Sequence, residues 1–600
     1  MKSIIKVIAM MTALLFIWSS GEGAEDQLTQ KLKLAERFEK EGRLEDALEV
    51  YQDLLQERPE STVLLDRIQG VLKELKRYPL LIEFINQRLE SNPGDFHLHL
   101  ALGEAQFLSG QVQEASQIWQ RALELSPQVE ESYLRVGGAF WERGMLAEAE
   151  EVFLRGRQAL NDEALFADRL ANIYELGADY GAATREYLRW LSQDERRLDY
   201  VNSRLAQFQD NPHVRRAVGE ALMSAVTANP DRPEFRYLLG HHLIRAGEPD
   251  EAYQHFVIIN ELEKDSSGSI LMTFAQRCAE LGHHLSAIKA CRDVMTLYPG
   301  TPSDRRARLE VGHNLVAMEQ YQEALLAYDE LILGHPQSPE AAEALYTKGE
   351  IYFLQLNDVA GALTAYRALA MAFEGGAWSA DATFRIGDCL AVKGDLDAAR
   401  EEYQRLSQGR VPEDVREKAS YKLARLSFLE GDLEEAKEKF DHLVSSFPQG
   451  FYVNDALVYS MFLDEGLSED KRSLHAYVEA MRLGYQRDYQ GALSAYQQAL
   501  EQFSKTGLGD DILMQMALLK EKTGHPQEAL ADLQDLIADY PESRLCPEAQ
   551  RRIGQIYELR LKELPLAIEA YEQVLSKYPH YLFLDDVRRK IRQLRGEGAS

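Results

Sequence analysis

Adjacent histidines are the first feature that could carry chemistry, because imidazole nitrogens bind transition metals. They occur as two pairs, His241/His242 and His283/His284. Neighbouring residues on a helix point in different directions, so each pair offers at most one ligand to a given site. The two pairs also occupy different positions of the repeat described below. Packed or exposed imidazoles are the simpler interpretation, and we expect no metal site.

Motifs for nucleophiles, catalytic metals and phosphate loops are missing from the sequence. It contains no H-E-x-x-H, no G-x-x-x-x-G-K-[ST] and no G-x-S-x-G. The four cysteines form no C-x-x-C pair, which is the spacing of many structural zinc sites. We therefore expect no catalytic residues and no cofactor, and we predict that the protein is not an enzyme.

The charge of the chain narrows the class of partner. Its 600 residues carry a formal net charge of −30, whereas nucleic acid or an anionic membrane would require the opposite sign. The excess suits an acidic protein in solution, or one whose partner is basic. The length also exceeds the ~250–300 residues of a single core. Several domains or a stacked repeat array remain.

A short frame recurs along the chain and is the strongest signal in the sequence. It consists of an alanine, an aromatic four residues later and often a proline shortly after the aromatic. Its period is about 34 residues at first and roughly 35–38 residues later, within the range of known repeat architectures. One longer gap separates Ala436 from Ala492. The alanine position is occupied by Ala47, Leu81, Ala115, Ala149, Ala183, Ala217, Ala252, Ala287, Ala324, Ala362, Ala399, Ala436, Ala492, Ala529 and Ala567.

A small residue precedes this alanine by twelve positions in most copies and indicates a first helix before the helix that carries the frame. We expect the small residue and the alanine to lie where the two helices approach most closely, since larger side chains would separate the backbones. The aromatic is expected to fill the groove to the next repeat, and the proline to end the second helix. The small residues include Gly103, Gly137, Gly240, Gly312, Gly349, Gly387 and Gly554.

These residues resemble the repeats of the tetratricopeptide-repeat family, over roughly residues 28–580. The resemblance implies an all-α fold, an α-solenoid wound as a right-handed superhelix of about 15 helix-turn-helix repeats. Two copies depart from the pattern: the second has Leu81 and Ile85, and the sixth has Ala221 in place of the aromatic. The longer period after Ala287 is similar to repeats of bacterial cell-envelope proteins, including the outer-membrane assembly lipoprotein and the cell-division coordinator that binds the Tol system.

The change of period and the long gap predict the domain organisation. Residues 25–265 form an N-terminal array, residues 266–450 a middle array and residues 451–580 a C-terminal array. The gap leaves room for an inserted helix near residues 474–483. Residues 581–600 are expected to form a capping helix and a frayed tail.

The segment 1–24 has the pattern of a signal peptide. Lys2 and Lys6 precede the apolar run Val7–Trp18, and small residues follow it. The run is shorter than the ~20 residues that cross a membrane. We expect an exported protein that is periplasmic or associated with the outer membrane; the alternative is an uncleaved N-terminal anchor in the inner membrane.

Cys278 and Cys291 fall on the first and second helices of one repeat, at positions that touch in this family. Export would permit a disulfide between them if their Cα atoms lie ~5.5 Å apart. The alternative is that they are two small buried apolar side chains.

In tetratricopeptide proteins the first helices line the concave face, and the positions three before and four after the small residue point inward. The acidic residues Glu104, Glu350 and Asp388 lie among them. Aromatics at helical spacing are also typical of a core, so each has a packing alternative. The expected partner-binding residues are Phe107, Trp141, Tyr237, Tyr346, Phe353, Phe384, Tyr421 and Phe428.

The sequence thus predicts a non-catalytic interaction scaffold of the bacterial cell envelope, which binds a peptide or helix of another protein on its concave face. The alternative is an accessory protein of a polysaccharide-export or envelope-assembly machine, with a pore, a synthase or the glycan as its partner. An enzyme with an unrecognised site is a third hypothesis, and the absence of any non-repeat domain argues against it. Self-association through an exposed end of the array is compatible with all three.

Overall fold

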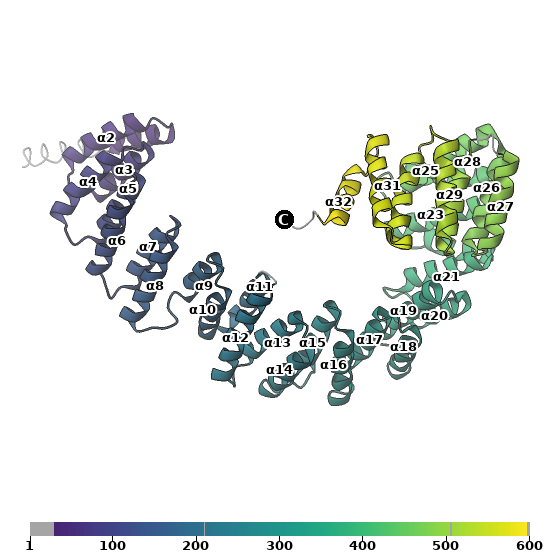
Figure 1. Ribbon diagram of the computed structural model, residues 1–600, viewed down its shortest axis with the longest axis horizontal. Coiled ribbons are helices and arrows are strands. Elements are labelled where there is room, and N and C mark those ends of the chain that lie inside the picture. Colours follow the sequence, from purple (N-terminus) through teal and green to yellow (C-terminus); the bar gives the residue numbers. More distant parts are fainter. Residues whose placement is uncertain (1–28, 209–210, 504–506, 597–600) are drawn as a thin grey trace, which may run out of the picture. The chain divides into compact units, whose positions relative to one another are not determined.

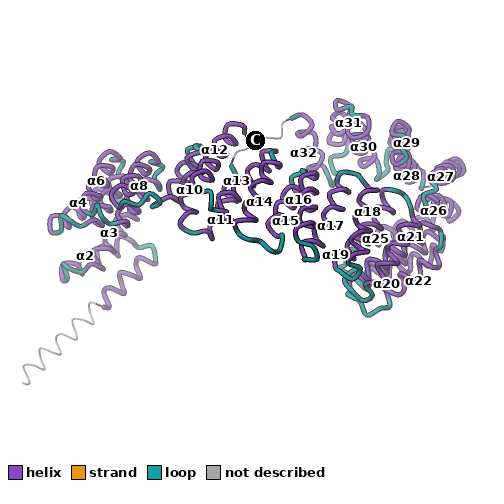
Figure 2. Tube along the Cα trace, turned by 90° about the horizontal axis from the view of Figure 1, so that it is seen from below, coloured by secondary structure: helices purple, strands orange, loops and turns teal. Residues whose placement is uncertain are grey.

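The computed structural model describes residues 29–208, 211–503 and 507–596. Within these residues every regular element is a helix, and Figure 2 shows them joined by short loops. The all-α solenoid prediction is therefore confirmed. The predicted signal peptide lies outside the described residues. None of the described helices combines the length and the apolar composition that a membrane crossing requires.

The chain divides into two compact units, one that ends at Asp265 and one that begins at Ser266. Figure 1 labels most of their helices in chain order. The helical residues 29–40 begin the first unit, and a 3-10 turn, Glu195–Arg197, precedes α11. Its further helices are α2 Leu44–Glu57, α3 Thr62–Glu74, α4 Tyr78–Ser91, α5 Phe96–Leu108, α6 Val112–Leu125, α7 Glu130–Trp141, α8 Leu146–Leu160, α9 Ala167–Leu176, α10 Tyr180–Gln193, α11 Leu198–Ala206, α12 Pro212–Ala228, α13 Pro233–Ala246 and α14 Pro249–Leu262.

The second unit continues the pairing of helices and contains two π-helical turns, η2 Ile351–Gln355 and η3 Ile556–Leu561. Its α-helices are α15 Ser269–Glu280, α16 His284–Leu297, α17 Pro302–Ala317, α18 Tyr321–Gly334, α19 Pro339–Glu350, α20 Val359–Ala372, α21 Ser379–Lys393, α22 Leu396–Ser407, α23 Glu413–Glu430, α24 Leu433–Ser446, α25 Val453–Glu469, α26 Lys471–Tyr485, α27 Tyr489–Phe503, α28 Gly509–Lys522, α29 Pro526–Asp539, α30 Cys546–Gln555, α31 Leu564–Lys577 and α32 Leu584–Arg595.

Seven repeats are held together by a ring that lies on a glycine. In these pairs the aromatic of the second helix covers the glycine of its own first helix, rather than filling the groove to the next repeat as predicted. A Cβ atom added at Gly312 would lie 2.2 Å from Cε1 of Tyr328. The same close approach, between 2.3 and 2.6 Å, occurs at Gly103 under Trp119, Gly137 under Phe153, Gly240 under Phe256, Gly349 under Tyr366, Gly387 under Tyr403 and Gly554 under Tyr571.

The sixth repeat shows what happens without this contact. It has the large Leu205 at the small position and Ala221 at the aromatic position. Here α12 packs mainly against α10 and α13 instead of its expected partner α11. The frame alanine of this copy, Ala217, is also only partly buried, whereas every other frame alanine is fully buried. In this repeat, the loss of both the ring and the small residue therefore goes together with a different pairing of the helices.

Two repeats contain one extra residue in the first helix. The interval from the small residue to the alanine is thirteen residues from Gly349 to Ala362 and from Gly554 to Ala567. In both repeats the first helix ends in a π-helical turn, η2 after α19 and η3 after α30. A π turn widens the helix by one residue, so the insertion is absorbed locally and the ring still covers its glycine.

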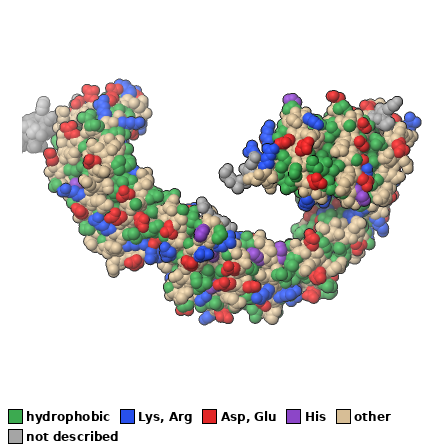
Figure 3. All heavy atoms as spheres, viewed as in Figure 1, with side chains coloured by type: hydrophobic (Ala, Val, Ile, Leu, Met, Phe, Trp, Pro, Cys, Tyr) green, Lys and Arg blue, Asp and Glu red, His purple; other side chains and the backbone are tan. Residues whose placement is uncertain are grey.

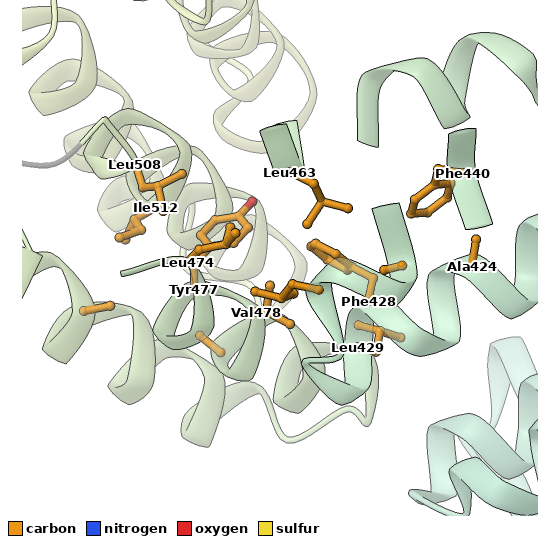
Figure 4. Close-up of a cluster of buried hydrophobic side chains, with 14 of the residues drawn as sticks. Ala424, Phe428, Leu429, Phe440, Leu463, Leu474, Tyr477, Val478, Leu508 and Ile512 are labelled. Atoms are coloured by element: carbon orange, nitrogen blue, oxygen red, sulfur yellow. The ribbon is translucent and has the colours of Figure 1, made fainter. Parts of the chain in front are cut away.

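The long gap between Ala436 and Ala492 contains two helices, α25 and α26, between α24 and α27. Residues 474–483 lie inside α26, which packs on α27 as a regular first helix. The helix without a counterpart in the other repeats is therefore α25. It packs on α24 and α26, and Figure 4 shows Leu463 of α25 in one cluster with Phe428 and Tyr477.

The turn after α26 reaches back to a repeat more than a hundred residues earlier. Arg487 donates a hydrogen bond of 2.8 Å to the carbonyl oxygen of Phe353 and a second bond to the side chain of Asn357. Its guanidinium also lies 4.4 Å from the centre of the Phe353 ring. This clasp connects the α26–α27 turn to the end of η2.

A buried ion pair links two repeats of the first unit. Arg157 of α8 and Glu186 of α10 expose only 4% and 5% of their side chains. Arg157 donates to Glu186 with one bond of 3.0 Å, and its Nε donates to the Leu165 carbonyl at 2.7 Å. Arg189 pairs with the same carboxylate. Such a pair is stable only while its partners remain together, because an unpaired buried charge is strongly destabilising.

We expect Gly312→Leu to loosen the α17–α18 pair by about 1–3 kcal/mol, because the new side chain must displace the Tyr328 ring. Faster amide hydrogen exchange in these two helices would show it. The control is Gly334→Leu, since a Cβ at Gly334 has no neighbour within 4 Å; its exchange should be unchanged or slower. Equal exchange rates in the two variants would contradict the role of the ring contact.

We expect Arg157→Met to destabilise the α8–α10 region by about 3 kcal/mol, because Glu186 then stays buried without its main partner. The double variant Arg157→Met/Glu186→Leu should be more stable than the single one, since no buried carboxylate remains. Urea denaturation, together with hydrogen exchange of the peptides from α8 to α10, measures both. A double variant that is less stable than Arg157→Met would contradict this account.

Candidate partner-binding surface

The eight aromatic residues predicted to bind a partner divide into two groups of four. One group is buried and is not presented to a partner: Phe353, Phe384, Tyr421 and Phe428. The other group is partly exposed: Phe107, Trp141, Tyr237 and Tyr346. The predicted partner-binding residues of the first unit are therefore partly accessible, whereas most of those in the second unit are covered by other side chains.

Side chains from neighbouring helices and from the α25–α26 region cover the buried group. Two of the four covering side chains are cations and two are tyrosines, so the rings make both cation–π and aromatic contacts. The contacts, measured to ring centres, are Arg487 over Phe353 at 4.4 Å, Lys418 over Phe384 at 4.2 Å, Tyr452 on Tyr421 at 4.7 Å and Tyr459 against Phe428 at 5.2 Å.

Tyr237 and Tyr346 are also engaged by neighbours within their own units. Tyr237 lies 4.5 Å from the His241 ring, measured between ring centres. Tyr346 lies 5.0 Å from Trp378, and its hydroxyl accepts a bond of 3.3 Å from Arg385. Both side chains are half-buried and pack against these neighbours, so neither projects from the surface as an anchor for a partner.

A depression of about 250 Å³ lies between the first helices α5 and α7. Its apolar walls come from Leu100, Leu134 and the ring of Trp119, and its α7 side is formed by Gly138 and Ala139. A Cβ atom added at Gly138 would meet no atom within 4 Å, so this position opens onto free space. The remaining lining residues are Glu104, Arg135, Glu142 and Arg143.

Arg143 is fixed at one side of this depression. It donates to the Ala139 carbonyl at 2.9 Å and to Glu104 at 2.9 Å. Its guanidinium also lies 5.2 Å from the Trp119 ring and 5.3 Å from the Phe107 ring. Only 12% of the side chain is exposed, so the charge is oriented in advance of any binding event, which lowers the entropy lost on association.

The acidic residues predicted on this face are already paired inside the protein. Glu104 accepts bonds from Arg143 and, at 2.8 Å, from Lys73. The other two pair with a cation of the following repeat and with the tyrosine of their own repeat. These contacts are Glu350 with Arg385 at 2.6 Å and with Tyr366, and Asp388 with Lys422 at 2.7 Å and with Tyr403 at 2.7 Å.

The histidines and cysteines that could carry chemistry are explained by packing. His241 and His242 are buried, and Nδ1 of His284 lies 2.9 Å from Oδ1 of Asn314. Across the described residues, no three His, Cys, Asp or Glu side chains gather as a metal site would require. Cys278 and Cys291 are thiols rather than a disulfide, and both are buried. Burial raises the pKa of Cys291 to about 12, which disfavours the thiolate that disulfide formation needs.

Sequence reasoning did not find the depression itself. Its opening depends on Gly138 and Ala139, which follow the packing glycine Gly137 in α7. Gly137 packs under Phe153, and the two small residues after it leave the exposed side of this first helix with little side-chain volume. This run of small residues was the signal in the sequence that could have indicated the depression. Arg143, six residues after Gly137, could not be recognised from the sequence, because its role depends on its contacts with α5 and α6.

Two family models match the chain. The tetratricopeptide-repeat model matches residues 100–164, 309–377 and 352–415. A model described as an outer membrane lipoprotein matches residues 413–571. No curated protein matches the sequence. The depression between α5 and α7 lies within the first tetratricopeptide match.

Several solved structures are similar at low identity. They include a tetratricopeptide-repeat protein from Parabacteroides merdae (15% identity, TM-score 0.29, 48% of this chain and 98% of that chain). They also include Naa15/Naa10 bound to HypK-THB (12%, TM-score 0.31, 95% and 97%) and the yeast Tom70 (14%, TM-score 0.27, 74% and 96%). These scores are too low for the structures to indicate function. The family-model matches, together with the repeat geometry, show that this chain is a tetratricopeptide-repeat protein.

Proposed function

We propose that this protein is a non-catalytic scaffold that binds a peptide or helix of another protein in the depression between α5 and α7. The observation that carries the proposal is a hollow on a first-helix face that combines apolar walls with charged residues, among them the pre-oriented Arg143. An apolar side chain of the partner fills the hollow, and Arg143 and Glu104 offer polar contacts to the partner backbone.

The size of the hollow supports a peptide anchor over a small-molecule substrate. Ligand pockets usually measure ~300–1,000 Å³ and enclose most of the ligand, whereas this hollow measures about 250 Å³. That volume suits one aromatic or aliphatic side chain of a larger partner.

The internal pairing of Glu104, Glu350 and Asp388 removes the strongest reason to expect a basic partner for these first-helix residues. Figure 3 shows both signs of charge interspersed over the visible surface.

The cellular location belongs to the same proposal. The match of residues 413–571 to the outer membrane lipoprotein model supports a place in the bacterial cell envelope, as does the signal-like sequence of residues 1–24. The protein would act in the periplasm or at the outer membrane, or be held by its N-terminus in the inner membrane. Its partners would then be components of envelope assembly, secretion or export.

A role as an accessory of polysaccharide export is the second candidate, with the pore, the synthase or the glycan as its partner. It places the protein in the same compartment and uses the same binding surface. An enzymatic role is not favoured, because the cation at the hollow, Arg143, is already paired with the Glu104 carboxylate.

We expect Gly138→Trp to abolish partner capture, because the indole fills the hollow from a position with free space around it. The replacement should not unfold α7, since an alternative to glycine raises helix propensity. The measurement is affinity capture from solubilised envelope of the source bacterium, with mass spectrometry of the retained proteins. Gly334→Trp, on the second helix α18 and equally unobstructed, is the matched control and should retain the partner.

The outcomes separate the candidates. A partner that is lost with Gly138→Trp and kept with Gly334→Trp supports the hollow as the binding site and identifies the machine. Retention of the same partner by both variants would show that binding uses another surface. Retention of polysaccharide in place of protein by the wild type would favour the second candidate.

A further inference from the structure

The helix α25, which has no counterpart in the other repeats, carries an exposed apolar strip. Leu457, Val458 and Met461 lie on one side of the helix at i, i+1 and i+4, and expose 41%, 62% and 63% of their surface. Phe451, in the turn before the helix, is 84% exposed. The opposite side of α25 packs on α24 through Ala456, Ser460 and Leu463. Contiguous exposed apolar side chains of this kind mark an interaction surface.

The surroundings of this strip are acidic. The segment from Phe451 to Glu469 contains four acidic residues, Asp455, Asp464, Glu465 and Glu469, and no lysine or arginine. One cation approaches from α24: Lys437 lies 3.3 Å from Asp464 and 2.7 Å from Asp441. The remaining carboxylates of α25 face solvent. An occupant of the strip therefore needs apolar anchors flanked by basic side chains.

The C-terminal region of the same chain has this chemistry. Leu582 and Phe583, directly before α32, are 85% and 49% exposed. The helix α32 contains five basic and two acidic residues, although the net charge of the whole chain is −30. The exposed side of α32 carries Arg588, Arg589 and Arg592. Arg588 and Arg589 also pair with Asp585 and Asp586 of the same helix, and Val587 and Ile591 attach the helix to α31.

We propose that the α25 strip binds the C-terminal region of a second copy of this protein. Leu582 and Phe583 of one copy pack on Val458 and Met461 of the next, and the arginines of α32 face Asp464 and Glu465. In its own chain α32 packs on α31, so this contact joins separate copies. The two surfaces differ, which makes the contact head-to-tail and capable of extension. The proposal is independent of the hollow between α5 and α7, which lies in the other unit.

The first test is sedimentation of the purified protein over a range of concentrations. The wild type should associate, and its apparent dissociation constant should rise as salt shortens the screening length from ~10 Å at 0.1 M to ~3 Å at 1 M. The strip variant Val458→Asp/Met461→Asp and the tail variant Leu582→Asp/Phe583→Asp should each weaken association by about ten-fold or more. Met371→Asp, at a position of α20 that is 78% exposed, is the matched control and should associate like the wild type.

The decisive measurement is a mixture of the two variants. Each retains one intact surface, so the mixture should form a complex of two chains and stop there, whereas each variant alone remains monomeric. Association of the strip variant with wild-type affinity would overturn the proposal, as would a wild type that stays monomeric at every concentration or a mixture that does not associate. Circular dichroism melting curves confirm that each variant is folded, since all four positions are exposed.

Discussion

In seven repeats an aromatic ring of the second helix lies on the bare backbone of a glycine in the first helix, so close that no Cβ atom would fit between them. A Cβ atom added at Gly387 would lie 2.4 Å from Cε1 of the Tyr403 ring. The contact fixes both the distance and the rotation of the two helices, since a ring has one flat face and the first helix has one position without a side chain. The tyrosine hydroxyl adds direction, because it donates to a carboxylate of the first helix, as Tyr403 does to Asp388. In the sixth repeat, where Leu205 and Ala221 replace both partners of the contact, the helices pair differently.

This dependence explains why so much of the fold could be predicted from the sequence. The ring and the small residue lie sixteen residues apart, as Gly312 and Tyr328 do, or seventeen in the two repeats with a π turn. This spacing indicates the pair, the turn and the repeat. The candidate surface could be predicted only in part, because exposure depends on residues far away in the chain. Phe353 follows the same positional rule as Phe107, but Arg487 covers it from 134 residues further on. No periodicity within a repeat contains that information. The same holds for the hollow, whose walls come from three consecutive helices.

The net charge of the sequence does not describe how the charged side chains are used in the structure. A net charge of −30 indicates an acidic surface, yet the carboxylates of the first-helix faces are joined to cations of the next repeat, as Glu350 is to Arg385 and Asp388 to Lys422. These pairs repeat along the array and connect neighbours, so part of the acidic composition contributes to stacking. The acidic excess is more local, and α25 is its clearest example, with four carboxylates and no lysine or arginine. Charge in a repeat protein therefore has to be assigned repeat by repeat before it indicates a partner.

The Arg487 clasp gives part of the second unit a property that a simple solenoid lacks. When each repeat touches only its neighbours, small hinge motions between repeats add together and the array stretches like a spring. The bonds from Arg487 to Phe353 and Asn357 close a loop of chain from η2 to the α26–α27 turn. Tension applied to the two ends of that loop must break the clasp before the intervening repeats can extend. The clasp therefore adds a resistance to extension in this segment that repeats in contact only with their neighbours do not have.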